Sequence, residues 1–108
     1  MGFKSKRSKA TDIPVKVRER VYDRDNGICI FCGGQGFPSC HYIPRSAGGL
    51  GIEENVVCAC MPCHHMMDNS ADRKLYQAKA RTYLSSLYPD WDETKLIYDK
   101  WAALKGVS

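Results

Sequence analysis

Two Cys-x-x-Cys motifs constrain the fold of this chain more than any other feature. The first is Cys29-x-x-Cys32 and the second is Cys60-x-x-Cys63, with residues 33–59 between them. Each motif places two thiolates on one turn, and four thiolates form the closed tetrahedral set that structural zinc prefers. Such a soft, saturated site leaves no open position for chemistry. We therefore predict one structural zinc ion, rather than redox-active pairs of the thioredoxin type, because no βαβ pattern surrounds either motif.

The length and composition agree with this prediction. The 108 residues suffice for one domain with a small core, and small domains often need such a staple. Residues 1–10 are polar and basic without a signal-peptide core, and no apolar run approaches the length of a membrane span. We expect a cytoplasmic protein, where thiols stay reduced and closely spaced cysteines bind metal more often than they form disulfides. Cys58 lies in an apolar run and is expected to be a small core residue.

Apolar periodicity and turn residues predict an α+β fold. A first helix begins after Thr11 or Asp12 as its cap, carries Pro14 in its first turn, and ends at Asn26-Gly27. The next elements expected along the chain are a knuckle over 28–34, strands within 37–43 and over 55–59 with a loop over 44–51 between them, and a helix over 62–69. An amphipathic helix ended by Pro89 follows. The last expected helix is capped by Asp90 and Glu93 and carries Ile97, Trp101 and Leu104 on its apolar face. Residues 12–70 would form the core, between a disordered basic arm over 1–11 and a helical extension over 71–108 packed on that core.

A second group of residues lies between the knuckles and just after them. His41 opens the segment His-Tyr-Ile-Pro-Arg-Ser-Ala-Gly-Gly, Asn55 belongs to Glu-Asn-Val-Val, and His64 directly follows Cys63. In this order the motifs resemble the HNH endonucleases, which carry a ββα-metal site. The resemblance covers roughly residues 14–70 and is specific only in the combination of its motifs.

The resemblance implies an enzyme that hydrolyses DNA phosphodiester bonds with a divalent cation. It implies that His41 is the general base, that Asn55 orients the imidazole or steadies the loop, and that His64 binds the catalytic metal. Histidine has a pKa suited to deprotonating water near neutral pH, and a cation stabilises charge on the phosphate and the leaving oxygen. The implied fold is a small zinc-stapled ββα-metal core with an N-terminal helix and two C-terminal helices.

The chain departs from the family pattern at Cys40, where many HNH proteins carry a metal-binding Asp, His or Glu. A thiol is a poor ligand for Mg²⁺, which prefers oxygen donors. Asp68, one turn after His64, is one candidate to complete the site. Alternatively the ion is softer, such as Mn²⁺, Ni²⁺ or Zn²⁺, with Cys40 among its ligands, or Cys40 is merely a small residue. Tyr42 alternates with His41 along the strand and should face the core.

The basic residues provide candidate DNA contacts. The net charge of +4 is compatible with a nucleic-acid partner, although a solvated surface would look the same. Arg45 is expected either to contact phosphate or to pair with an acidic residue, and His65 to face DNA or solvent. The candidates in the N-terminal arm are Lys4, Lys6, Arg7 and Lys9.

Two other classes of function remain open from the sequence. The same zinc scaffold would serve as a DNA-binding module without catalysis if Cys40 has disabled the metal site. It would also serve as an interaction module whose C-terminal helices dock a larger enzyme. A minimal HNH domain of this size looks like those encoded by bacteriophages near packaging genes, which implies DNA and the packaging machinery as partners, in the cytoplasm of the bacterial host.

Overall fold

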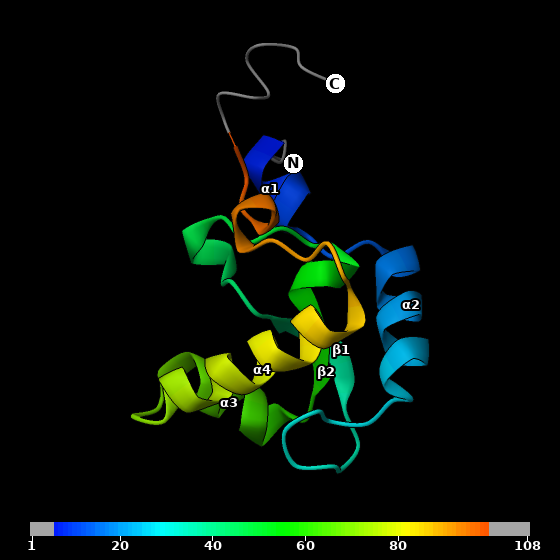
Figure 1. The fold of residues 1–108 in the computed structure, drawn as a ribbon, viewed down its shortest axis with the longest axis vertical. Helices are drawn as coiled ribbons and strands as arrows, with labels where there is room; N and C mark the ends of the chain where they lie inside the picture. The colour runs from blue at the N-terminus through cyan, green and yellow to red at the C-terminus, as the bar shows by residue number, and fades with distance from the viewer. Residues whose placement is uncertain (1–5, 100–108) are drawn as a thin grey trace, which may run out of the picture.

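The computed structural model describes residues 6–99, which form a small α+β unit around a two-stranded antiparallel sheet (Figure 1). The strands are β1 (Phe37–His41) and β2 (Val56–Ala59). The α-helices are α1 (Lys6–Thr11), α2 (Val15–Asp25), α3 (Met61–Asn69) and α4 (Arg73–Leu87). Three 3₁₀ helices complete the described elements: η1 (Arg45–Ala47), η2 (Glu53–Asn55) and η3 (Glu93–Leu96). Helix α2 contacts both strands, and α3 packs against α4.

The sheet positions His41 at the boundary between core and surface. Cys40 pairs with Val57 and His41 with Val56, and an irregularity in the register precedes them. Because side chains alternate along a strand, Cys40 and Tyr42 point into the core while His41 lies on the opposite side. All four residues of β2 are buried. The predicted core positions of Tyr42 and Cys58 are confirmed.

Helix α2 ends where the turn residues predicted. Asn26 has φ 57° and Gly27 has φ 63°, so both occupy the left-handed region that stops a helix. The start of the helix differs from the expectation, because Pro14 is the N-cap residue and no side chain caps it. The caps proposed at Thr11 and Asp12 are therefore wrong. Thr11 instead ends α1 and is buried, with only 3% of its surface exposed.

Residues 6–11 form helix α1, which differs from the disordered arm predicted over 1–11. Arg7 donates a hydrogen bond of 2.8 Å to the Ser46 carbonyl, and the N–H of Gly51 donates one of 2.9 Å to the Ala10 carbonyl. These contacts to a loop distant in sequence supply the stability that the polar composition of the segment lacks. Lys4 lies outside the described residues.

Residues 71–99, the part of the predicted C-terminal extension that the structure describes, contain one of the two predicted helices. Helix α4 carries the expected apolar face, with Ala80 and Leu84 fully buried. Beyond Pro89 the described residues form η3, which is capped by Asp92 rather than Asp90. Ile97 then pairs with Gly49 in an isolated antiparallel bridge, so extended pairing replaces the predicted helix at this point. Trp101 and Leu104, assigned to the same predicted helix, lie outside the described residues.

A buried ionic network joins α2 to β2 and α4. Arg24 donates two hydrogen bonds, of 2.8 and 3.0 Å, to the Asp25 carboxylate, whose side chain is fully buried. The same carboxylate accepts from the Cys58 N–H at 2.9 Å and from the Tyr83 hydroxyl. Arg24 also donates to the Tyr88 hydroxyl at 3.0 Å. The network satisfies both buried charges and fixes the position of α2 beside the sheet.

Among residues 6–99, no helix has the combined length and apolar character that a membrane-crossing segment requires.

Candidate functional site

The four predicted zinc ligands meet at one point. The sulfur atoms of Cys29, Cys32, Cys60 and Cys63 all lie within 4.8 Å of one another, and those of Cys32 and Cys60 are 3.6 Å apart. Tetrahedral zinc with Zn–S bonds of about 2.3 Å requires sulfur atoms about 3.8 Å apart. The cluster can therefore hold a metal ion such as zinc.

In each knuckle a backbone N–H donates a hydrogen bond to one cysteine sulfur, which favours the thiolate form of that sulfur. The N–H of Cys32 donates to Cys29 Sγ, and the N–H of Cys63 donates to Cys60 Sγ, each at 3.5 Å. Burial raises the pKa of Cys29, but hydrogen bonds from the backbone of Cys60, Cys32 and Phe31 outweigh it and lower that pKa to about 6. Burial and the neighbouring sulfur atoms of Cys60, Cys29 and Cys32 raise the pKa of Cys63, so binding of a metal ion to four thiolates must release protons from the cluster.

His41 ends β1, and a backbone carbonyl determines which of its ring nitrogens carries the proton. Its Nε2 lies 2.8 Å from the carbonyl oxygen of Thr11. A carbonyl oxygen can only accept, so Nε2 is the donor and Nδ1 keeps a free lone pair. Burial lowers the pKa of His41 against the raising effect of the bond to Thr11, and the positive charge of Arg45 adds to the lowering. The imidazole is therefore neutral and able to accept a proton at neutral pH.

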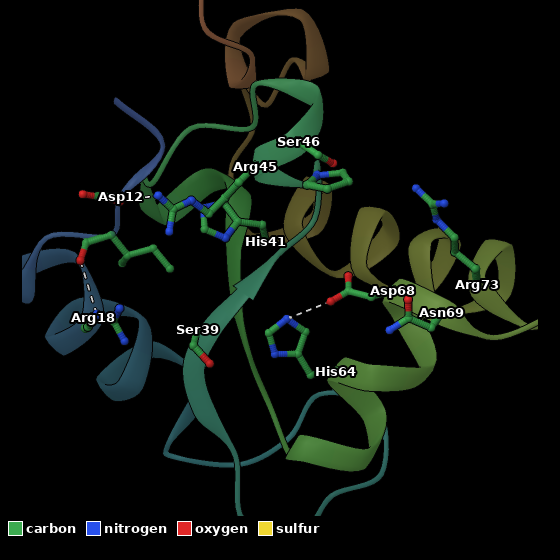
Figure 2. A pocket seen from close by; sticks show the side chains of 12 residues that line it. Asp12, Arg18, Ser39, His41, Arg45, Ser46, His64, Asp68, Asn69 and Arg73 are labelled. Atoms are coloured by element: carbon green, nitrogen blue, oxygen red, sulfur yellow. Dashed lines mark hydrogen bonds and ion pairs between the residues drawn. The ribbon is translucent and has the colours of Figure 1, made fainter. Parts of the chain in front are cut away.

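His64 and Asp68 lie one turn apart on α3. His64 Nε2 is 3.3 Å from Asp68 Oδ2, and both side chains are partly exposed. In Figure 2, His64 and Asp68 project from α3 into the same space that His41 borders from the strand side. The predicted pairing of these two residues on one helix face is confirmed.

An open cavity of about 760 Å³ brings these groups together. Its walls come from the N-terminal segment, α2, β1, the loop after β1, α3 and the start of α4 (Figure 2). Arg18 and Arg73 are among the lining residues, and Arg73 was not singled out from the sequence. The complete lining is Asp12, Ile13, Arg18, Ser39, His41, Pro44, Arg45, Ser46, His64, Asp68, Asn69 and Arg73.

Asn55 performs the second of its two expected roles, that of steadying the loop. Its side chain is fully buried and bridges both ends of the loop after β1. Its Oδ1 accepts from the Ile43 N–H at 2.8 Å, and its Nδ2 donates to the carbonyls of Leu50 and Ile43 at 2.8 and 3.2 Å. The asparagine thereby fixes the turn that follows His41.

Cys40 is not a ligand of the cavity, which corrects its inclusion among the candidate metal-binding residues. Its side chain is fully buried on the core side of β1, where the thiol donates to Met67 Sδ at 3.4 Å. Burial, followed by the nearby charge of Asp68, raises the pKa of Cys40 to about 12. Because the thiol is protonated and turned away from the cavity, Cys40 is a small core residue, as the last of the alternatives from the sequence had it.

Some of the basic residues that the sequence offered as DNA contacts are bound to other parts of the protein, and the others are exposed. Arg45 forms an ion pair with Asp12, which is the second of its two expected roles. Arg7 is held by carbonyl groups of the loop after β1. The remaining candidates, Lys6, Lys9 and His65, are exposed, and His65 lies outside the cavity, 3.4 Å from Asn69.

Sequence patterns could not reveal the contact between Thr11 and His41. It uses a backbone carbonyl, and every residue has one, so no residue type marks it. Arg73 likewise becomes part of the site only when α4 is placed in space.

No protein-family model and no curated protein sequence matches this chain.

Proposed function

We propose that this protein is a zinc-stapled, metal-dependent DNA endonuclease of the HNH type. The observation that carries the proposal is that His41 on β1 and the His64–Asp68 pair on α3 line a single open cavity. A general base, a pair of cation ligands and a cationic rim are the parts that hydrolysis of a phosphodiester requires.

His41 acts as the general base through Nδ1. The hydrogen bond from Nε2 to Thr11 holds the neutral imidazole in one tautomer. Nδ1 accepts the proton of a water molecule as the oxygen of that water attacks phosphorus. Because burial keeps the pKa of His41 low, the base is unprotonated at the start of the reaction.

The donor set of His64 and Asp68 fits a divalent cation. Two ligand atoms each about 2.1 Å from an octahedral ion are about 3 Å apart, close to the 3.3 Å between His64 Nε2 and Asp68 Oδ2. One nitrogen and one carboxylate oxygen suit Mg²⁺, Mn²⁺ or Ni²⁺, with water and phosphate as the other ligands. When bound, such a cation stabilises negative charge on the phosphate and the leaving oxygen.

Arginine side chains at the cavity recognise the phosphate backbone. Arg18 and Arg73 line the cavity on opposite sides of His64 (Figure 2). A guanidinium binds phosphate through paired N–H groups and carries no sequence information by itself. We therefore expect cleavage with little sequence preference.

Zinc in the four-cysteine cluster would hold the site in shape without taking part in catalysis. Cys60 is the N-cap residue of α3, and Cys63 directly precedes His64 on that helix. A saturated tetrahedral ion therefore fixes the start of α3, and with it the direction in which His64 points.

The test is cleavage of supercoiled plasmid by the zinc-loaded protein with added Mg²⁺, Mn²⁺ or Ni²⁺. Adjacent histidines provide a matched pair of variants, since only His64 lines the cavity. We expect His64→Ala to lose cleavage and His65→Ala to retain it. Binding of DNA without cleavage in every metal would instead identify a DNA-binding module.

A further inference from the structure

We infer that residues 6–13, here called the N-terminal strap, complete the catalytic site by fixing the imidazole of His41. The inference rests on the proposed function, in which His41 is the base. It assigns a positioning role to the backbone carbonyl of Thr11, which contacts Nε2 of the ring and not the proposed base Nδ1. The sequence of the strap, polar and basic, pointed instead to a disordered arm that binds DNA.

The hydrogen bond between the strap and His41 is well placed for this role. The Thr11 carbonyl is 2.8 Å from Nε2, and Thr11 is itself buried, so water does not compete freely for the contact. A histidine ring has two tautomers and can rotate about its last side-chain bond. The hydrogen bond that Nε2–H donates to this carbonyl selects the tautomer and restricts that rotation, which leaves the lone pair of Nδ1 free.

Contacts along its length hold the strap against the loop after β1 and against α2. At one end Arg7 donates to the Ser46 carbonyl at 2.8 Å, and in the middle Gly51 donates to Ala10 at 2.9 Å. Toward the other end Asp12 pairs with Arg45. Arg18 then donates to the Ile13 carbonyl at 3.2 Å. A segment built only to bring positive charge to DNA would not need this set of bonds.

Gly51 does not line the cavity, so a substitution there moves the strap without replacing a cavity side chain. A Cβ atom at Gly51 would lie 1.8 Å from the Asp12 carbonyl oxygen and 2.4 Å from its carbonyl carbon. Both are backbone atoms, so Gly51→Ala must push the strap away from the loop. The Thr11 carbonyl, one residue earlier, would then leave His41.

The experiment is ¹⁵N NMR of the His41 ring in the full-length, zinc-loaded protein, without DNA or a second metal. In the wild type we expect Nε2 to be protonated, with a proton that exchanges slowly, and Nδ1 to be unprotonated. In Gly51→Ala we expect a mixture of tautomers and fast exchange. Protonation of Nδ1 in the wild type would overturn the inference. An unchanged ring in Gly51→Ala, with the amide signals of residues 10–13 displaced, would overturn it as well.

Arg7→Ala and Lys9→Ala give a second, milder comparison should Gly51→Ala not fold. Each removes one positive charge from α1, but only Arg7 holds the loop. We expect Arg7→Ala to speed exchange at Nε2 and to lower kcat by about 10-fold with KM unchanged, as a misplaced base would. Lys9→Ala should match the wild type in the exchange rate at Nε2, and equal exchange rates in the two variants would contradict the role of the strap.

These results separate the inference from the proposed function. The NMR measurement needs no cleavage, so it reports on His41 even if the protein does not cut DNA. A wild type with protonated Nε2 that never cleaves would refute the nuclease and retain the strap as the element that fixes His41.

Discussion

His64 Nε2 lies 3.3 Å from Asp68 Oδ2, one helical turn further along α3, and both side chains face the cavity bordered by His41. A lone His–Asp pair on a helix surface contributes little to stability. In the proposed function the pair also binds a cation, since the nitrogen and oxygen atoms are spaced as two ligands of one ion. Asp68 would then take the place of the carboxylate or imidazole that the HNH pattern has at the position of Cys40.

Asp68→Asn should weaken metal-dependent cleavage, because a neutral amide is a poorer ligand for a hard cation than a carboxylate. We expect a loss of about 10-fold or more in kcat/KM at limiting Mg²⁺, partly recovered at high Mg²⁺. The measurement is a Mg²⁺ titration of the cleavage rate. Asp72→Asn, with the same change in charge at an exposed position outside the cavity, serves as the control. Identical titrations for Asp68→Asn and the wild type would exclude Asp68 as a ligand.

The pH profile should reveal a base with a lowered pKa. Burial, with the positive charge of Arg45, holds the pKa of His41 below 6.5. The acid limb of kcat/KM should therefore lie below pH 6.5, since the base is lost only when it is protonated. The same shift makes the unfolded chain bind more protons, so the free energy of unfolding falls as the pH decreases through 6.5. An acid limb of kcat/KM that is due to His41 and lies above pH 6.5 would contradict the buried environment described for this ring.

The sequence predicted the parts of the site that depend on local patterns. The two Cys-x-x-Cys turns and the strand alternation of His41 and Tyr42 required only residue type and spacing. The helical spacing of His64 and Asp68 belongs to the same class. Each of these features is encoded within a few residues, so no tertiary contact was needed to find it.

Features that depend on distant backbone groups could not be predicted in this way. The strap is ordered because carbonyl and N–H groups of residues 46–51 meet it, and such groups leave no trace in residue type. The segment after η3 is extended because Tyr98 donates to the Gly48 carbonyl at 2.8 Å, although its composition favours a helix. Tertiary pairing decided both segments against their local preference.

Removal of Arg24 should strongly destabilise the fold. Arg24→Met leaves the fully buried Asp25 carboxylate without its ionic partner, and breaking such a pair costs about 3–5 kcal/mol. The measurement is the free energy of unfolding in urea. Arg20→Met removes a charge from an exposed position of the same helix and should change that free energy by less than about 0.5 kcal/mol. Equal stability of the two variants would show that the network is not a structural element.

Cys60→Ala should lose both zinc and cooperative unfolding. Structural zinc supplies about 10–16 kcal/mol of apparent binding free energy in small domains, as much as the whole stability of an ordinary domain. Metal analysis and thermal melting measure the two effects. Cys40→Ala is the cysteine control, and it should keep a full complement of zinc while losing about 1 kcal/mol from the core. Unchanged melting of Cys60→Ala would count against a structural metal ion.

The rate of a single turnover of DNA cleavage by His41→Ala tests the central claim most directly. The variant should bind zinc and DNA as the wild type does, because the side chain of His41 is not part of the four-cysteine cluster or the arginine contacts. Loss of a general base typically slows a reaction by about 10²–10⁴-fold, and we predict a decrease in this range. Cleavage by His41→Ala at the wild-type rate would contradict the assignment of this cavity as the active site.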